Sequence, residues 1–212
     1  MKKENYYQNK EVEKIRVLEP WINQVTGLIP NCNHKILDVG CGEGSYSTLL
    51  KKDGNEVWGI ELSEKAGKIA RSQIDRVIIQ DAEKAWSVPL EYFDVVTLLR
   101  YLEHVFDYNF QLRQCRRALK TGGQLVMYSP NISILEKIRL LTGRVPAYAS
   151  DMEHIRQFTK PFLFKILREN GFKPIYCEGY KFVIPHAKFR IRPFEKIFPN
   201  SCPCIFLKAV KV

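Results

Sequence analysis

Three glycines that alternate behind an aspartate are the residues whose types and spacing most plainly suggest chemistry. Gly40, Gly42 and Gly44 follow Asp38 in the stretch Asp38-Val39-Gly40-Cys41-Gly42-Glu43-Gly44. Glycine allows a sharp turn and a close approach between backbone and ligand, because it has no Cβ. A G-x-G-x-x-G dinucleotide site would need its third glycine at position 45, which is Ser45, and the Asp38 carboxylate would repel a pyrophosphate. Spacing and charge therefore favour a positively charged ligand, such as a sulfonium, over a dinucleotide.

Two further acidic residues follow short apolar runs downstream of the glycines. Glu61 comes directly after the run that ends at Ile60, and Asp81 lies just past Val77-Ile78-Ile79. An ionised carboxylate offers two acceptor oxygens, so Glu61 can accept hydrogen bonds from both hydroxyls of a ribose. Asp81 is placed to accept from an adenine amino group, and its alternative role is to cap the segment that follows it.

His104 and His154 are the candidate general bases. Histidine is the side chain whose unperturbed pKa suits proton transfer at neutral pH. Both residues fall in segments expected to overhang one edge of the sheet, whereas His34 precedes the first strand and belongs at the opposite edge. The alternative for each is a histidine that hydrogen-bonds to backbone and fixes a loop.

These residues are positioned by an alternation of apolar strands and helices. Strands are predicted at residues 35–39, 56–60, 77–79, 93–98 and 124–128, and helices at 45–52, from 63 onward, and at 109–119. The last of these helices is expected to be closed by the turn Thr121-Gly122-Gly123. Regular alternation implies parallel pairing with helices on both faces of one sheet, and a ligand crevice at the carboxyl ends of the strands.

The flanking segments complete a single predicted domain over residues 1–212. An amphipathic helical cap is expected in residues 1–34, from apolar positions at Val12, Ile15, Leu18, Ile22 and Val25. Residues 131–160 are interpreted as an insertion over the crevice. A helix over 162–170 with Gly171 at its end, and a strand pair at 173–180 and 205–210, would close the fold.

Composition sets limits on the class of protein. The chain has 212 residues, 45% hydrophobic and 26% charged, which is typical of one folded domain. Its apolar runs are too short to span a bilayer, and its basic start lacks a secretory signal, so a cytoplasmic protein with reduced cysteines is expected. The net charge of +10 would attract an anionic partner, which leaves nucleic acid, phospholipid headgroups and acidic metabolites open.

The stretch Ile36 to Gly44, taken with Glu61, Asp81 and Lys120-Thr121-Gly122-Gly123, resembles the class I S-adenosylmethionine-dependent methyltransferases. Leu102-Glu103-His104-Val105 and the segment from His154 to Thr159 resemble the ubiquinone-biosynthesis-like small-molecule group. The resemblance implies a Rossmann-like α/β fold: a seven-stranded sheet, mostly parallel, with an antiparallel last strand and helices on both faces. It also implies S-adenosylmethionine as cofactor, held by Asp38, Gly40, Cys41, Gly42, Gly44, Glu61, Leu62, Asp81, Ala82, Leu99 and Arg100.

The same resemblance raises the question of a metal. Some relatives hold a divalent ion with a Glu-x-x-Glu-His pattern, but here Arg100 stands at the first position. A fixed positive charge opposes cation binding, so we predict no metal, with Glu103, His104 and His154 as ligands the alternative. Arg100 is instead available to bind an acidic acceptor.

Methyl transfer to oxygen, nitrogen or carbon of a small anionic or lipid-linked acceptor is the function expected from these features. An RNA methyltransferase is the first alternative, because the chain is basic, although no RNA-binding module is evident. A protein that binds S-adenosylmethionine without catalysing a reaction is the second.

Overall fold

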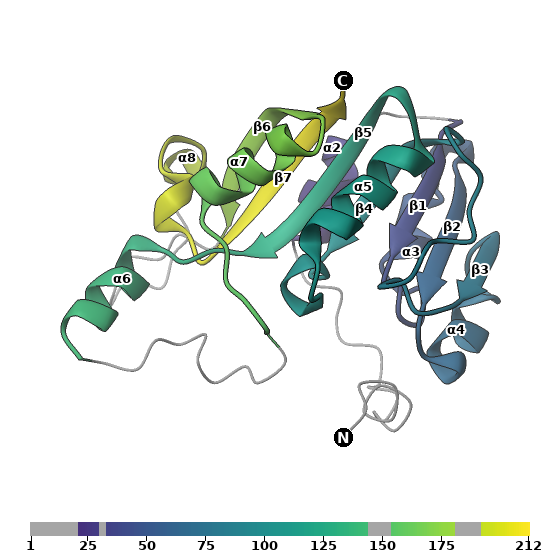
Figure 1. The fold of residues 1–212 in the computed structure, drawn as a ribbon, viewed down its shortest axis with the longest axis horizontal. Helices are drawn as coiled ribbons and strands as arrows, with labels where there is room; N and C mark the ends of the chain where they lie inside the picture. The colour runs from purple at the N-terminus through teal and green to yellow at the C-terminus, as the bar shows by residue number, and fades with distance from the viewer. Residues whose placement is uncertain (1–20, 30–32, 144–153, 181–191) are drawn as a thin grey trace.

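The computed structural model describes residues 21–29, 33–143, 154–180 and 192–212. Its centre is a seven-stranded sheet with the strand order β3-β2-β1-β4-β5-β7-β6 (Figure 1). The strands are β1 (Lys35–Val39), β2 (Glu56–Glu61), β3 (Arg76–Ile79), β4 (Phe93–Leu99), β5 (Leu119–Pro130), β6 (Phe172–Tyr180) and β7 (Cys204–Lys211). This order reverses at β1, which places β1 between β2 and β4, at the point where such folds bind their ligands.

The first five strands pair in parallel, as the sequence predicts. Residues 36–39 of β1 are all buried, because helices cover both faces of the sheet and leave no face for polar side chains. In this register Asp38 lies opposite Gly59 of β2 on one side and Thr97 of β4 on the other. The carboxyl ends of β1, β2 and β4 therefore meet at one edge.

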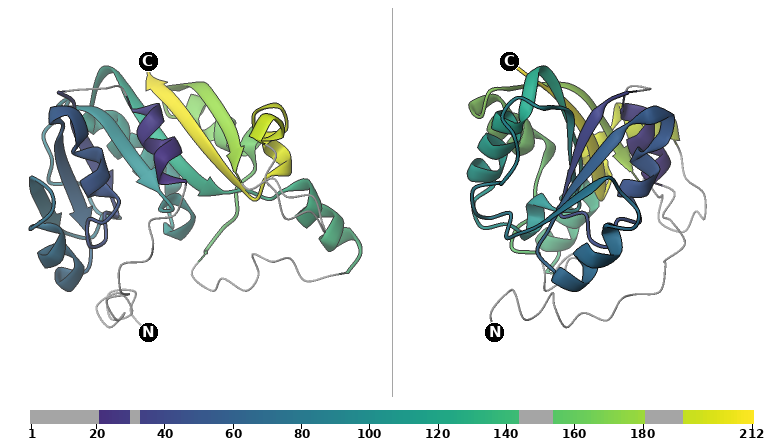
Figure 2. Two further views of the ribbon diagram at one scale, coloured as in Figure 1. Left: turned by 180° about the vertical axis from the view of Figure 1, so that it is seen from behind. Right: turned by 90° about the vertical axis from the view of Figure 1, so that its right-hand side faces the viewer.

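Helices pack on both faces of the sheet, in agreement with the predicted fold class. One face carries α5 (Tyr108–Ala118) and α7 (Lys160–Glu169), which contribute Leu112 and Leu163 to a common apolar core. The other face carries α2 (Ile22–Leu28), α3 (Ser47–Leu50) and α4 (Glu64–Ala70) over a second core. The two further views show these layers from behind and from the side (Figure 2).

The last three strands form an antiparallel edge, which confirms the predicted strand pair. β7 pairs antiparallel with β5 on one side and with β6 on the other. The Lys211 ammonium ties the end of β7 to its neighbours, because it donates to the Glu91 carboxylate at 2.8 Å and to the Leu119 carbonyl at 2.7 Å.

Two predicted helix boundaries were wrong. The helix expected over 45–52 is only one turn long, α3, and a short 3-10 helix (Lys52–Gly54) follows it. Helix α5 ends at Ala118 and β5 begins at once, so Thr121-Gly122-Gly123 does not close the helix. The register between β4 and β5 jumps from Phe93 opposite Leu119 to Val95 opposite Gln124. The glycine-containing turn is therefore an irregularity inside β5.

The flanking segments are described only in part. Of the predicted cap over 1–34, residues 1–20 and 30–32 lie outside the described residues, but α2 packs on the sheet through Ile22 and Val25. Within the insertion, α6 (Ile134–Leu141) extends beyond the carboxyl end of β5 (Figure 1). A helix that was not predicted, α8 (Arg192–Ile197), lies at the same end of the molecule. Among the described residues, no helix has the length and apolar character needed to cross a membrane.

Candidate active site

Asp38 is held in place at the end of β1 by two hydroxyl groups. The Ser47 hydroxyl, from α3, donates to one carboxylate oxygen at 2.6 Å, and the Thr97 hydroxyl, from β4, donates to the other at 2.6 Å. Only 3% of Asp38 is exposed. The carboxylate thus fixes the glycine loop against two neighbouring elements. Direct contact of Asp38 with the cofactor stays a prediction.

Burial raises the pKa of Asp38 to about 6. Loss of water around the carboxylate is the main cause, the hydroxyls of Ser47 and Thr97 oppose it, and the nearby charge of Glu61 adds to it. At neutral pH the group is nevertheless ionised, and it supplies a negative charge beneath the loop.

The three glycines of the loop serve different purposes. All have positive φ angles, which explains why glycine occupies these positions. A Cβ on Gly40 would lie 2.6 Å from Cδ2 of Tyr101, and one on Gly44 would lie 3.2 Å from the Ala70 backbone, so these two glycines allow close packing within the protein. A Cβ on Gly42 would meet nothing within 4 Å. Gly42 is therefore the glycine whose missing side chain leaves space for a ligand.

Glu61 joins the glycine loop to the end of β2. One of its carboxylate oxygens accepts from the Gly42 backbone N–H at 2.9 Å, and the other accepts from the Ser63 N–H at 2.8 Å. Each carboxylate oxygen has a second lone pair. The side chain is thereby oriented beside Gly42 with acceptor capacity left over, as a ribose-binding carboxylate requires.

Asp81, the third acidic residue, makes the hydrogen bond expected of its alternative role as a cap. Asp81 Oδ1 accepts from the Glu83 backbone N–H at 2.9 Å, so Asp81 caps the turn that follows β3. Beside it, the Ala82 carbonyl accepts from Trp86 Nε1 and Gln111 Nε2 within the core. The predicted adenine contact of Asp81 and the contacts of Ala82 stay predictions, as does that of the half-buried Leu62.

Cys41, Leu99 and Arg100 lie at the same edge of the sheet in different environments. The Cys41 thiol packs into the core, close to Gly59, and burial raises its pKa. Leu99, the last residue of β4, is half-buried. Arg100 follows it with a φ of 53° and an exposed side chain. A left-handed conformation costs a non-glycine residue about 1 kcal/mol, and such strain is common at functional sites. Of the three, Arg100 is the one that presents a charge to solvent.

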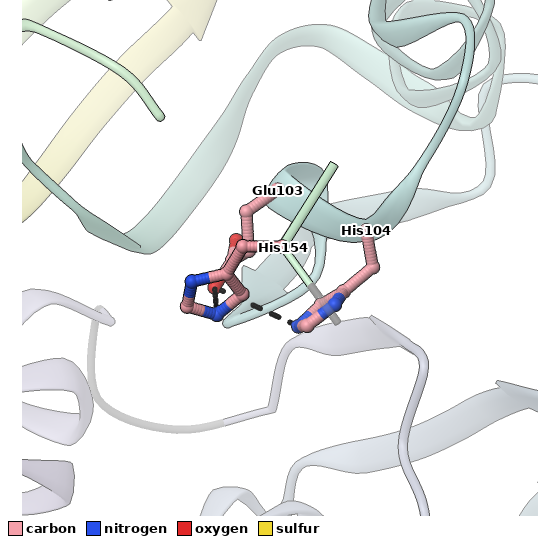
Figure 3. A group of neighbouring side chains, drawn as sticks. All are labelled: Glu103, His104 and His154. Carbon is pink, nitrogen blue, oxygen red and sulfur yellow. Dashed lines mark ion pairs between the residues drawn. The ribbon is translucent and has the colours of Figure 1, made fainter. Parts of the chain in front are cut away.

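Glu103, His104 and His154 form a cluster next to this edge (Figure 3). Glu103 Oε1 lies 3.9 Å from His104 Nε2 and 4.0 Å from His154 Nε2, and the centroids of the two imidazole rings are 4.9 Å apart. The Glu103 side chain is fully buried, while the imidazoles of His104 and His154 are 18% and 8% exposed. The two histidines that the sequence singles out, 50 positions apart, thus lie together beside one carboxylate.

Backbone hydrogen bonds bring the two segments of the cluster together. Glu103 and His104 lie on a 3-10 helix (Leu102–His104), and the N–H of Ile155 donates to the Glu103 carbonyl at 3.0 Å. Gln157 Nε2 lies 3.1 Å from His154 Nδ1. If that amide donates, Nδ1 is the acceptor and the neutral imidazole carries its proton on Nε2, toward Glu103. His154 is then held in one orientation, while His104 is the more exposed imidazole.

Comparison with known proteins identifies the family. A family model described as a methyltransferase domain matches residues 10–176. This chain belongs to the methyltransferase domain family. It is a class I methyltransferase of the ubiquinone-biosynthesis-like group, and S-adenosylmethionine is the cofactor that this membership implies.

Two relatives of this methyltransferase are both named ubiquinone biosynthesis O-methyltransferase. The protein from Idiomarina loihiensis is 38% identical over 107 residues, which cover 47% of this chain and 44% of the relative. That from Bordetella avium is 30% identical over 177 residues, or 76% of this chain and 70% of the relative. In most of the first matches the chain spans about half the length of the relative.

Solved structures confirm the fold. A methyltransferase from Thermotoga maritima aligns with a TM-score of 0.71 at 23% identity, over 90% of this chain and 87% of the other. The magnesium protoporphyrin IX methyltransferase from Synechocystis, solved with S-adenosylhomocysteine, aligns with a TM-score of 0.65 at 18% identity, over 90% and 82%. These likenesses support the seven-stranded Rossmann-like sheet.

The residues present fit the cofactor. The open space above Gly42, with Glu61 beside it and the buried negative charge of Asp38 below the loop, suits a ribose attached to a cationic sulfur. Sequence reasoning did not assign the residues that support these side chains. Ser47 and Thr97 orient Asp38, Tyr101 packs against Gly40, and Gln157 lies against His154. Thr97 had a usable signal, because parallel pairing of the first and fourth strands places it opposite Asp38.

Proposed function

We propose that this methyltransferase transfers a methyl group to a hydroxyl of a small acceptor that is anionic or lipid-linked. The observation that carries the proposal is the Glu103–His104–His154 cluster next to the edge that holds Gly42 and Glu61. A hydroxyl is a weak nucleophile until its proton is removed, and a histidine is suited to that task. The names of the relatives support oxygen as the methylated atom.

The roles within the cluster follow from exposure and hydrogen bonding. Bound S-adenosylmethionine supplies a methyl group on a positively charged sulfur. His104, the more exposed imidazole, removes the acceptor proton, and the Glu103 carboxylate stabilises the imidazolium that results. His154, held by Gln157, positions Glu103 and excludes water. Arg100, exposed at the end of β4, attracts an anionic group of the acceptor.

Methyl transfer from labelled S-adenosylmethionine to a panel of phenols tests the proposal. The panel contains phenols that carry a carboxylate, a polyprenyl chain, or neither. With an accepted phenol, His104→Gln should lower kcat by about 100-fold or more and leave cofactor affinity unchanged. His34→Gln, at the opposite edge of the sheet, is the control and should retain full activity.

Two outcomes would contradict this assignment. Unchanged kcat in His104→Gln would remove the general base. Loss of activity in EDTA that Mg²⁺ or Zn²⁺ restores would show that activity requires a metal, against our prediction, and would make the same three side chains its candidate ligands. Methylation of RNA but of no phenol would instead favour the nucleic-acid alternative, and cofactor binding without any methyl transfer would favour the non-catalytic one.

A further inference from the structure

The turn that follows β3 is attached to α5 through two glutamine side chains. Gln111 Nε2 donates to the Ala82 carbonyl at 2.9 Å, and Gln114 Oε1 accepts from the Trp86 backbone N–H at 3.2 Å. The two glutamines follow each other at helical spacing, so they lie on one side of α5. Asp81, the residue predicted to bind the adenine amino group, directly precedes Ala82. The position of Asp81 therefore depends on α5 as well as on the end of β3.

Tyr101 connects this attachment to the glycine loop. Its hydroxyl donates to Gln111 Oε1 at 3.3 Å, and its ring packs against Gly40, where a Cβ would lie 2.6 Å from Cδ2. The Ala82 carbonyl can only accept, so the Gln111 amide is oriented with its oxygen toward Tyr101. Burial, and then the charges of nearby carboxylates, raise the pKa of Tyr101, so the hydroxyl keeps the proton that it donates. Two successive hydrogen bonds thus join the ring beneath the loop to the turn that carries Asp81.

Tyr101 and Gln111 depend on each other, because the polar atoms that join them are shielded from water. Gln111 is 1% exposed, and the Ala82 carbonyl to which it donates also accepts from Trp86 Nε1 at 2.8 Å. Without the Tyr101 hydroxyl, the Gln111 amide oxygen would stay buried with no donor, which costs more than the hydrogen bond contributes. Movement of the Gln111 amide toward another donor would shift Ala82 with it. The two side chains therefore act on the turn as one unit.

We propose that Tyr101 and Gln111 are a positioning pair that sets how strongly this methyltransferase selects the adenine base of its cofactor. A fixed spacing between Gly40 and Asp81 lets one ligand contact the glycine loop and the turn after β3 at the same time. The proposal rests on the predicted adenine contact of Asp81, and it is independent of the acceptor. The His104 N–H donates to the Tyr101 carbonyl at 3.0 Å, so the backbone of Tyr101 and not its hydroxyl holds the proposed general base.

Isothermal titration calorimetry with two ligands tests the pair. S-inosylhomocysteine differs from S-adenosylhomocysteine by a carbonyl oxygen in place of the amino group, and this oxygen cannot donate to Asp81. The wild type should bind S-adenosylhomocysteine at least about tenfold more tightly. Tyr101→Phe and Gln111→Met should each reduce that preference about fivefold, because each removes one of the two successive hydrogen bonds. Gln114→Met removes a hydrogen bond to the same turn at Trp86, and as the matched control it should keep the wild-type preference.

The double variant Tyr101→Phe/Gln111→Met distinguishes one unit from two independent contacts. It should lose no more of the preference than Gln111→Met alone, whereas independent residues would give additive losses. Should Gln111→Met fail to fold, Tyr101→Phe carries the test, because it keeps the ring against Gly40.

Four outcomes would overturn the proposal. The first three are an additive loss in the double variant, the same change in Gln114→Met, and equal weakening of both ligands, which a general loosening of the fold would cause. The fourth is equal binding of the two ligands by the wild type. That result would remove the adenine contact of Asp81 and this proposal with it, while methyl transfer to a hydroxyl would stand.

Discussion

Asp38 is a carboxyl group that lies almost completely out of water, between the hydroxyls of Ser47 and Thr97. Burial raises its pKa from 3.8 to about 6, so the folded protein keeps this proton to a higher pH than the unfolded chain does. The contribution of this group to the free energy of unfolding is therefore lost as the pH rises from about 4 to about 6. Above that window the free energy of unfolding stays at the lower level. The shift corresponds to about 3 kcal/mol.

The substitution Asp38→Asn removes this titration and tests the assignment. The free energy of unfolding of the variant, relative to the wild type, should rise by about 3 kcal/mol between pH 4 and pH 7, measured by urea denaturation. Asp94→Asn should show the opposite trend at lower pH: its free energy of unfolding, relative to the wild type, should fall as the pH rises toward about 4 from below, and should change little above that. Although burial raises the pKa of Asp94, hydrogen bonds from Lys120 and from the Lys35 backbone outweigh that effect and hold the pKa below its usual value. A pH-independent difference for Asp38→Asn would show that this carboxyl titrates normally.

Gly42 and Gly122 form a matched pair of glycines. Both have positive φ, and a Cβ at either would meet nothing within 4 Å. Alanine at either position should therefore cost about 1 kcal/mol of stability through backbone strain. Of the two, Gly42 is the one that lies beside Glu61. Gly42→Ala should therefore weaken S-adenosylmethionine binding at least about tenfold, whereas Gly122→Ala should leave it unchanged. Isothermal titration calorimetry measures both affinities. Equal affinities for the two variants would mean that the ligand does not use the space above Gly42.

The tryptophan that precedes helix α2 adds to the contacts of Ile22 and Val25 with the sheet. Trp21 is fully buried, and its ring stacks on Tyr128 of β5 at 4.4 Å between centroids and lies 4.7 Å from the ring of Tyr46. Helices as short as α2 are not stable alone, so their position depends on such contacts.

Truncation of this side chain should therefore weaken the whole fold. Trp21→Ala should lower the free energy of unfolding by about 3–5 kcal/mol, because it leaves a large cavity against the sheet. Asn23→Ala, at an exposed position on the same helix, should change it by less than about 0.5 kcal/mol. Urea denaturation measures both, and equal effects would show that α2 contributes little to stability.

The sequence predicts strands better than it predicts their irregularities. The runs at 35–39, 56–60 and 93–98 are apolar because both faces of the sheet are covered, and the structure confirms them. The irregularity within β5 depends on its pairing with β4, which the sequence of β5 alone does not show. Helix α8 presents its apolar side outward, so it lacks the periodic pattern of a helix that faces the core. The same limit applies to the site. Asp38 and Glu61 mark strand ends, but the register that pairs Asp38 with Thr97 exists only after the sheet forms.

Ligand binding and stability are linked across the whole fold, because the glycine loop, β2 and β4 all contribute to one site. At a concentration about 100 times its Kd, S-adenosylhomocysteine should stabilise the protein by about 2.7 kcal/mol. For a chain of this length that corresponds to a rise in Tm of about 5–10 °C, measured by differential scanning fluorimetry. NAD at the same concentration is the control and should leave Tm unchanged. A rise with NAD instead would return the site to the dinucleotide class.

The position of β7 has a consequence for synthesis of the chain. β7 comes after both of its partners in the sequence, yet it lies between them in the sheet. On the ribosome, β5 and β6 must therefore wait with open hydrogen-bonding edges until residues 204–211 emerge and join them. Open edges of this kind invite pairing with other chains. A stalled or truncated nascent chain that lacks this segment is thus expected to aggregate, or to depend on chaperones, even though every residue of the predicted cofactor site has already been made.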